Sequence, residues 1–447
     1  MLLYGCNVLK NISKKMNQRT TVIIGAGAIL DFNFDNIPFP STANITDIVS
    51  KLTVHGLDNE NSTIIPTIYA EINQIIKNLN NRYVKFNDLN FEELYSIIEH
   101  LWSINVVSNK NTDYGSRLYS PRAIPLYGYF LNLQQNIDYP NIEYERALIC
   151  IVRTIIDIIY QYNKRFQDNI LGESWYRQFW SNRLNTWDIF TLNYDTTIEN
   201  SLTEFEDGFE SVPNKDYEHF NPTKLYNNAK LLSTIHHLHG CINYAEFNPV
   251  EFEFEHSNRD MYKLANWNLE LLNKYLDFQS PPSNQTYSQY INSPIIVGQR
   301  KLDKLIYLPY SIYHANLANK IIKNPNLLIV GYSFGDIYIN QLIERHRLIH
   351  RTNQKVILID KFPEYVESST SLYKFLTHNV NGGMKNFLSR QLNYGISPEL
   401  KIQGLNIKSH DLPIISDDQC TMLLINGFKS SAIEHHQEIY NFLDRRK

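Results

Sequence analysis

The expected fold depends on one stretch, Trp187-Asp188-Ile189-Phe190-Thr191-Leu192-Asn193-Tyr194-Asp195. Its first half is an apolar run that predicts a buried strand, and its second half carries polar groups. Strands of an open parallel sheet deliver their C-terminal residues to the crevice where ligands bind. Asn193 and Asp195 are therefore candidate site residues. Asp195 has an alternative role, because Thr196 and Glu199 have the spacing of a capping box at the start of a helix.

Composition describes an ordinary globular protein. The chain has 447 residues, of which 43% are hydrophobic and 20% charged, so it can bury a substantial core in one large domain or two. A formal net charge of -4 gives no global electrostatic footprint for nucleic acid, and no nucleic-acid-binding motif is found. The four cysteines are scattered, which argues against a disulfide framework and a zinc-ribbon module and favours a reducing cytoplasm.

No membrane segment or signal peptide is expected. The most apolar helical segment, residues 147–160, is interrupted by Arg153 and Asp157 and does not reach the length that spans a bilayer. In residues 1–20 the lysines follow the short apolar piece, which reverses the order of a signal peptide. These residues are interpreted as an N-terminal extension of a cytoplasmic protein.

Another predicted strand, Thr20-Thr21-Val22-Ile23-Ile24, runs directly into Gly25-Ala26-Gly27-Ala28. Glycines at a first βα turn allow positive φ and let backbone N–H groups approach a pyrophosphate. The dinucleotide fingerprint requires a third glycine where Leu30 stands, and Asp47 is better explained as first-turn helix chemistry, so a standard dehydrogenase is disfavoured. The alternative is a tight turn that only packs a helix on the sheet.

The remaining pattern predicts one Rossmann-like, mostly parallel α/β sheet flanked by helices over residues 21–447, with two insertions. A large helical insertion covers about residues 45–185, with helices at 64–79, 91–104, 144–166 and 174–184. A second insertion covers about 245–290, with a helical piece at 264–275. Further strands are predicted at 229–235, 294–298, 326–332 and 355–360, and further helices at 314–323, 337–346 and 431–445.

The strand that begins near residue 229 ends in His236-His237-Leu238-His239-Gly240. In extended geometry His237 and His239 share one face, so at most two of the three histidines reach one site. Metal binding is disfavoured, because no His-Glu-x-x-His motif or cysteine partner accompanies them. A histidine before glycine at a strand end suits a general base, with an ordinary hydrogen-bonded histidine as the alternative.

Two later strands also end in polar residues. Gly331-Tyr332-Ser333-Phe334-Gly335-Asp336 places small and hydroxyl-bearing residues before a helix, which suits phosphate or ribose binding. Asp336 is predicted to cap that helix. Asp360 ends the next strand, where its carboxylate either accepts hydrogen bonds from ribose hydroxyls or caps the following element.

The order of these motifs over about residues 20–365 resembles the sirtuin family. In sirtuins the Gly-Ala-Gly loop binds the nucleotide phosphates, Asn-x-Asp orients the nicotinamide ribose, the histidine before Gly is the base, and Gly-x-Ser holds the adenosine half. The resemblance implies a catalytic pair, Asn193 and His239. It implies NAD contacts from Gly25, Ala26, Gly27, Ala28, Asp31, Asp195, Gly331, Ser333, Phe334 and Asp360, and no metal.

Three departures separate this chain from the protein-deacetylating sirtuins. Leu192 stands where they have a Gln, Asp31-Phe32 follows the glycine loop without their Arg, and their four-cysteine zinc module is missing. The pattern is more similar to bacterial sirtuin-like NADases of anti-phage defence. That similarity implies a hydrolase that destroys NAD+ in abortive infection, as a homo-oligomer or with a partner such as a HerA-type ATPase.

The chemistry implied is cleavage of the nicotinamide–ribose bond to nicotinamide and ADP-ribose. This reaction passes through an oxocarbenium-like transition state. Because the nicotinamide of NAD+ is already cationic, no acid has to protonate it. Asn193 is expected to hold a ribose hydroxyl or the water, and His239 to accept the proton. The alternatives are a sirtuin-type deacylase or ADP-ribosyltransferase with the same site, and a non-catalytic nucleotide-binding subunit.

Overall fold

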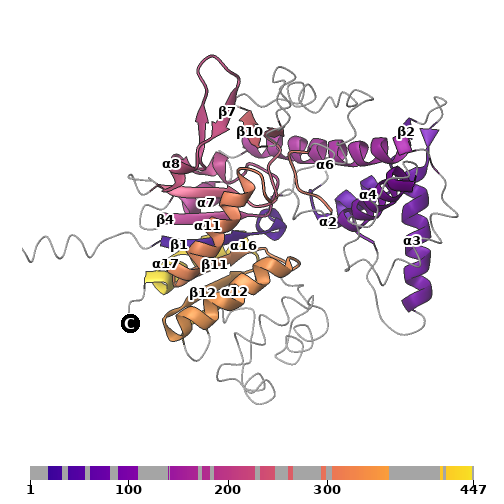
Figure 1. Ribbon diagram of the computed structural model, residues 1–447. Helices are drawn as coiled ribbons and strands as arrows, with labels where there is room; N and C mark the ends of the chain where they lie inside the picture. Colours follow the sequence, from indigo (N-terminus) through magenta and orange to yellow (C-terminus); the bar gives the residue numbers. More distant parts are fainter. Residues whose placement is uncertain are drawn as a thin grey trace, which may run out of the picture.

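The computed structural model describes residues 19–32, 39–55, 61–80, 89–108, 139, 141–169, 174–181, 186–226, 232–246, 260–264, 293–298, 305–361, 413–415 and 419–444. Within them, eight strands form one sheet (Figure 1) in the order β13 (Ile414–Ile415), β14 (Thr421–Leu424), β12 (Lys355–Ile359), β11 (Asn326–Val330), β1 (Arg19–Ile24), β4 (Thr186–Thr191), β8 (Ser233–His237) and β5 (Phe205–Glu206). Neighbouring strands run parallel except β13 and β14. The predicted Rossmann-like α/β sheet is confirmed.

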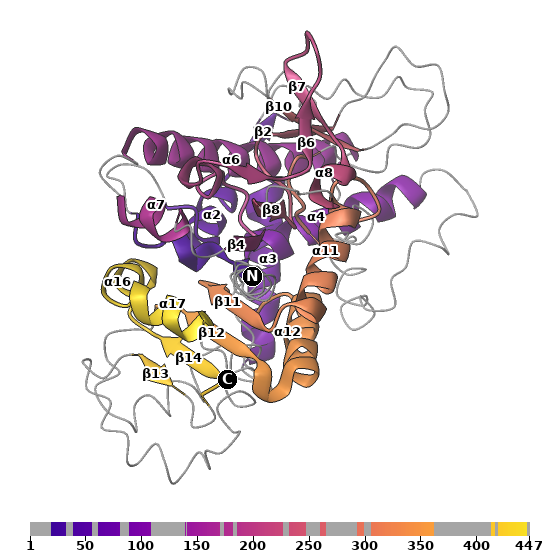
Figure 2. The ribbon, with the colours of Figure 1, turned by 90° about the vertical axis from the view of Figure 1, so that its left-hand side faces the viewer.

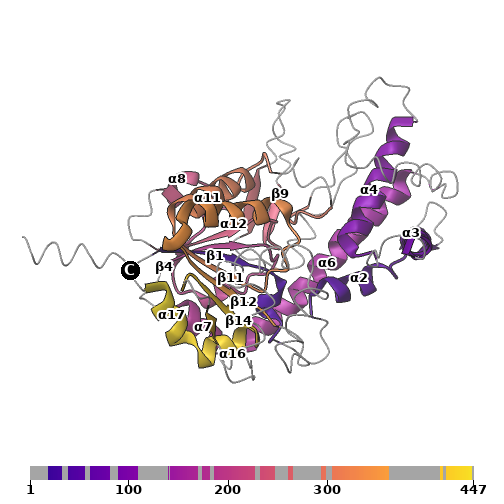
Figure 3. The same ribbon diagram turned by 90° about the horizontal axis from the view of Figure 1, so that it is seen from below.

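Helices cover both faces of the sheet, as Figures 2 and 3 show. One face carries α11 (Tyr310–Lys323) and α12 (Ile337–His350), and the other carries α7 (Ser174–Trp180), α16 (Phe428–Glu434) and α17 (His436–Asp444). Alternate residues of each central strand point to opposite faces of the sheet. Ile23 packs in the core beneath α11 and α12, and Val22 packs in the core beneath α7, α16 and α17. This explains why the central strands are apolar throughout, because a strand buried on both sides has no solvent face.

The chain reverses its direction of travel across the sheet at β1. From β1 it moves to β4 and β8 on one side, and it later occupies β11, β12 and β14 on the other. Parallel strands on both sides of such a switch point leave a crevice at their carboxyl ends. The segments that follow β1, β4, β8, β11 and β12 therefore meet along one edge of the sheet.

The helical insertion faces that edge (Figures 1 and 3). Four of its described helices lie there, α2 (Thr42–Val49), α3 (Ile64–Asn80), α4 (Phe91–Ser108) and α6 (Asn141–Asn169), whereas α7 of the same insertion packs on the sheet. The three helices predicted at 64–79, 91–104 and 144–166 are confirmed. Leu94 and Ile98 on α4 and Leu148 and Ile151 on α6 are fully buried, so the helices hold each other through apolar faces.

A second, smaller sheet is antiparallel. It consists of β6 (Phe209–Ser211), β7 (Tyr217–Phe220), β10 (Met261–Leu264) and β9 (Tyr244–Glu246). A separate two-stranded ribbon pairs β2 (Val54–His55) with β3 (Asn61–Ser62). Among the described residues, no helix combines the length and the apolar character needed to cross a bilayer.

Several predicted elements differ from the structure. Residues 294–298 form no strand and make one isolated bridge, Gly240 to Ile295. Their backbone pairs with the turn at 239–241, which is too short to extend a ladder. The helix predicted at 431–445 is two helices, α16 and α17, separated at His435. Leu264 belongs to β10 rather than to a helix. The rest of 264–275, residues 229–231 of the strand predicted at 229–235, and residues 1–18 of the extension lie outside the described residues.

Candidate functional site

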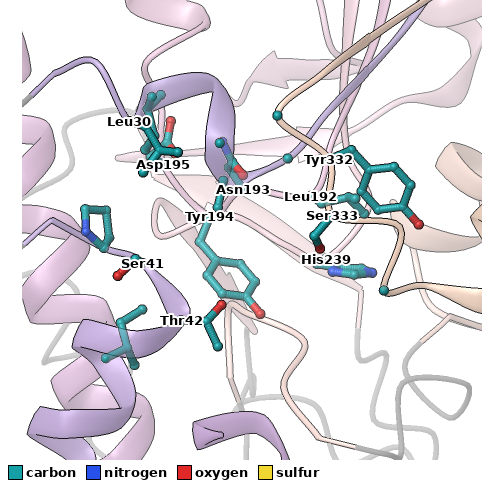
Figure 4. A pocket seen from close by; sticks show the side chains of 18 of the residues that line it. Leu30, Ser41, Thr42, Leu192, Asn193, Tyr194, Asp195, His239, Tyr332 and Ser333 are labelled. Atoms are coloured by element: carbon teal, nitrogen blue, oxygen red, sulfur yellow. The ribbon is translucent and has the colours of Figure 1, made fainter. Parts of the chain in front are cut away.

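A cavity of about 680 Å³ opens at the carboxyl edge of the sheet (Figure 4). This volume falls within the range of small-molecule binding sites. Nine of the twelve residues predicted for the site line it: Gly25, Ala26, Gly27, Asn193, Asp195, His239, Gly331, Ser333 and Asp360. The fold thus brings together residues from five strand ends that are up to 335 positions apart in the chain, from Gly25 to Asp360.

Ala28, Asp31 and Phe334 are not among the lining residues. Ala28 is fully buried beneath the glycine loop, and Phe334 stacks on Tyr332 with ring centroids 4.8 Å apart. Asp31 accepts a hydrogen bond from the Lys429 backbone N–H at 2.8 Å, which ties the loop to α16. Each has a packing role in the structure, and its contact with a nucleotide stays a prediction.

The glycine loop differs from the prediction in its backbone geometry. Gly25 has φ of -116° and ψ of -179°, an extended conformation, and Ala26–Ile29 form a short 3-10 helix, η1. Neither Gly25 nor Gly27 has positive φ. The N–H of Gly27 donates to Gly331 O at 2.9 Å and that of Ala28 to Gly25 O at 3.0 Å, so these donors already serve the protein.

These glycines are required by the contact between two loops. A Cβ on Gly25 would lie 2.5 Å from Gly331 O, and a Cβ on Gly27 would lie 2.7 Å from Gly331 Cα. Gly331 has φ of +58°, and its own Cβ would meet Ala28 N at 2.1 Å. The loops after β1 and β11 therefore pack backbone against backbone, and this contact shapes the floor of the cavity.

The predicted capping box after Asp195 is wrong. Asp195 Oδ1 accepts hydrogen bonds from the backbone N–H of Thr197 at 3.1 Å and from its hydroxyl at 2.5 Å. The element that follows is η4 (Glu199–Ser201), a three-residue 3-10 helix without a side-chain cap, and Glu199 pairs with a histidine instead. Asp195 thus stabilises an Asx turn. Burial raises the pKa of its carboxyl above the usual value.

The three histidines go to three different environments. His236 stacks on Phe190 with centroids 4.4 Å apart, and burial lowers its pKa to about 4. His237 Nε2 lies 2.6 Å from Glu199 Oε1. His239 alone of the three lines the cavity. The prediction that His237 and His239 share a face is wrong, because β8 ends at His237 and the chain turns through Gly240, whose φ is +91°.

His239 is paired with a carboxylate from another strand end. Its Nε2 lies 3.3 Å from Oδ2 of Asp336. The other oxygen of Asp336 accepts hydrogen bonds from Tyr338 N–H at 2.9 Å and Ile339 N–H at 3.2 Å, which confirms the predicted N-cap of α12. A carboxylate fixed by two backbone donors can hold the imidazole in one orientation, as the base of a catalytic pair requires.

Asp360 stands at the opposite end of the cavity, after β12. Its carboxylate accepts a hydrogen bond from Lys361 N–H at 2.8 Å, and burial raises its pKa to about 6. From β12 to β8 the cavity crosses five adjacent strands, which at the usual strand spacing is a span of about 19 Å. An extended molecule with hydroxyls at one end and a reactive group at the other fits this arrangement.

The predicted helical insertion supplies one wall of the cavity, and the sequence pattern did not indicate which residues would line it. Ser41, Thr42, Phe91 and Glu92 line the cavity, and Ser41 caps α2 by accepting a hydrogen bond from Asn44 N–H at 3.1 Å. Figure 4 shows Ser41 and Thr42 across from Asn193. These contacts are tertiary, so no local signal could have revealed them.

A family model described as SIR2-like domain matches residues 188–378. The matched region contains the ends of β4, β8, β11 and β12, and with them Asn193, His239 and Asp360. The glycine loop precedes it. No curated protein matches the chain. The match supports a sirtuin-like family, and a sirtuin-related, NAD-dependent function fits both the SIR2-like domain and the cavity.

Proposed function

We propose that this protein is an NAD+ glycohydrolase that cleaves the nicotinamide–ribose bond and releases nicotinamide and ADP-ribose. One observation carries the proposal: Asn193 and His239 line the same cavity as the glycine loop. The two side chains come from neighbouring strands, β4 and β8, and Figure 4 places both on the cavity wall. In a SIR2-like domain this is the arrangement expected around the nicotinamide ribose.

The order of the strand ends supports one direction for NAD+ in the cavity. Asp360 offers a carboxylate to ribose hydroxyls at the adenosine end. Ala26 and Ser333 line the middle, where the two interlocked loops leave room for the pyrophosphate. Asn193 and His239 then meet the nicotinamide ribose at the other end. The glycines act by removing side chains from this path, since the N–H groups of Gly25 and Gly27 donate within the protein.

The residues can assist hydrolysis without a nucleophilic side chain. Nicotinamide leaves with the bonding electron pair, and positive charge develops on the ribose ring. Asn193 holds the ribose hydroxyl or the attacking water in place, which removes the entropic cost of finding it. When the Nε2–H of a neutral His239 donates to Asp336, Nδ1 is the basic nitrogen that takes the proton from water. The products are nicotinamide, ADP-ribose and a proton.

Incubation of the purified chain with NAD+, with and without an acetylated peptide, tests the reaction class. Release of nicotinamide together with free ADP-ribose, independent of peptide, is the expected result. Release that requires the peptide would identify a deacylase, and ADP-ribose found on protein would identify a transferase. NAD+ binding without any release would leave a nucleotide-binding subunit as the explanation.

A biological role follows from the resemblance to defence NADases. We propose that hydrolysis depletes cellular NAD+ during phage infection, in a homo-oligomer or with a partner such as a HerA-type ATPase. NAD+ levels measured in infected cells that express the wild type or His239→Ala test this role. Equal NAD+ levels in the two strains would contradict it.

A further inference from the structure

Behind the NAD cavity lies a second group of reactive side chains, Glu199, His237 and Cys241. Each offers one metal-ligating atom, and these atoms all lie within 4.8 Å of one another. None of the three lines the NAD cavity. The side chain of His237 is 2% exposed and that of Glu199 11%, while Cys241 is a buried free thiol. Glu199 begins η4, which follows β4. His237 ends the neighbouring strand β8, and Cys241 lies in the turn just after it.

The hydrogen bonds of His237 leave one ring nitrogen directed at the cluster. Its Nδ1 lies 3.3 Å from the backbone oxygen of Asn193, and its Nε2 lies 2.6 Å from Glu199 Oε1. A histidine whose one N–H donates to a backbone carbonyl presents its other nitrogen as a ligand. Metal-binding histidines are held in this way in most proteins.

The second carboxylate oxygen of Glu199 is also buried. Among the described residues, its Oε2 is buried and has no hydrogen-bond partner. Glu199 also lines a second cavity of about 550 Å³, together with Asn163, Asn243 and Lys263. The side-chain oxygens of Asn163 and Asn243 are likewise buried without a partner, and Lys263 is paired with Asp207. The cavity therefore presents several oxygen acceptors and leads to the cluster.

We propose that Glu199, His237 and Cys241 bind a zinc ion, with the fourth position open to the second cavity. A set of one oxygen, one nitrogen and one sulfur ligand suits zinc, and tetrahedral coordination needs ligand atoms about 3.5 Å apart. Zinc replaces the thiol proton of Cys241 and the proton between His237 and Glu199, and both protons pass to the solvent. Water or a small anion supplies the fourth ligand.

The zinc ion would act on the NAD site through the backbone. It fixes the ring of His237, whose Nδ1–H donates to the carbonyl of Asn193. It also joins the segment after β4 to the end of β8, the two strand ends that carry Asn193 and His239. Zinc here is thus a positioning element that lies outside the reacting atoms.

Metal content and cobalt absorption test the site without any NAD assay. The full chain, without a histidine tag, is equilibrated with zinc under reducing conditions, dialysed, and analysed for metal; one zinc per chain is expected. Substitution with Co²⁺ should give intense visible bands of a tetrahedral site and a thiolate-to-cobalt charge-transfer band. A chain that retains no zinc and shows no such bands would overturn the proposal, whatever its activity toward NAD+.

Variants locate the metal. Cys241→Ser should lose the charge-transfer band. Glu199→Gln should weaken zinc binding by about 10-fold or more. Cys150→Ser, which changes a half-buried thiol on α6, should keep one zinc and the full spectrum. If Cys241→Ser does not fold, Glu199→Gln decides, because it preserves the shape of the side chain. Wild-type zinc content in a folded Cys241→Ser or Glu199→Gln variant would contradict the assignment.

Discussion

Nε2 of His239 and Oδ2 of Asp336 lie 3.3 Å apart, although their strands, β8 and β11, are separated in the sheet by β4 and β1. The contact joins the base proposed for NAD+ cleavage to the first turn of α12. Asp336 therefore has two tasks, one for each carboxylate oxygen. One oxygen caps the helix and the other orients the histidine.

Substitution of Asp336 by Asn separates these two tasks. Asn caps a helix about as well as Asp, so the free energy of unfolding should change by less than about 1 kcal/mol. The negative charge beside His239 is lost, and kcat for nicotinamide release should fall by about 100-fold with little change in KM. Steady-state kinetics and urea unfolding measure both effects.

A matched substitution tests whether the loss is specific. Asp47→Asn removes an exposed carboxylate that pairs with Lys51 and does not line the cavity. It should leave both kinetics and stability at wild-type values. Normal kcat in Asp336→Asn would show that the carboxylate does not position His239.

Gly331 is expected to tolerate no side chain. An alanine there would require the left-handed backbone at φ of +58° and would place its Cβ 2.1 Å from Ala28 N. The backbone conformation alone costs about 1–2 kcal/mol, and the overlap adds to it, so Gly331→Ala should lose more than about 2 kcal/mol of stability. Urea unfolding measures this loss.

Gly335 provides the control for that substitution. A Cβ on Gly335 would meet only Ser333 Oγ, at an ordinary 3.6 Å. Gly335→Ala should therefore unfold within about 0.5 kcal/mol of the wild type. Equal stability of the two variants would mean that the β1 and β11 loops are not locked together as the structure shows.

Asp360 should make stability depend on pH. Burial raises its pKa from 3.8 to about 6, so the folded state binds the proton more tightly than the unfolded chain does. Its contribution to stability is present below pH 3.8 and is lost as the pH rises through about 6. Asp360→Asn removes this titration and should be more stable than the wild type near neutral pH by about 1–3 kcal/mol.

The same substitution should weaken NAD+ binding. Loss of a charged acceptor for ribose hydroxyls predicts a roughly 10-fold higher dissociation constant. Asp157→Asn, on the exposed face of α6, should alter neither stability nor binding. Unfolding curves from acidic to neutral pH and titration calorimetry with NAD+ make the comparison. A stability difference that does not depend on pH would contradict the buried-carboxylate explanation.

The sequence predicted the architecture because the relevant signals are local. The apolar runs of β1, β4, β11 and β12 and the three- to four-residue spacing in α4 and α6 each mark their own element. Because parallel strands present their carboxyl ends at one edge of the sheet, Asn193, His239 and Asp360 could be expected in one crevice.

The parts that could not be predicted depend on contacts between distant residues. Whether His237 shares a face with His239 depends on where β8 stops, and this is set by its pairing with β4 and the turn at Gly240. The true constraint on Gly25 and Gly27 is a backbone more than 300 positions away, at Gly331. The cluster of Glu199, His237 and Cys241 likewise has no ligand spacing that a sequence pattern would reveal.

The most direct test of the central claim is to measure nicotinamide release and NAD+ binding side by side in the wild type, Asn193→Ala and His239→Ala. Both variants are expected to bind NAD+ with nearly wild-type affinity, because the glycine loop and Asp360 remain. Nicotinamide release by each variant should fall by about 100-fold or more. Full nicotinamide release by both variants would show that the two residues do not carry the reaction.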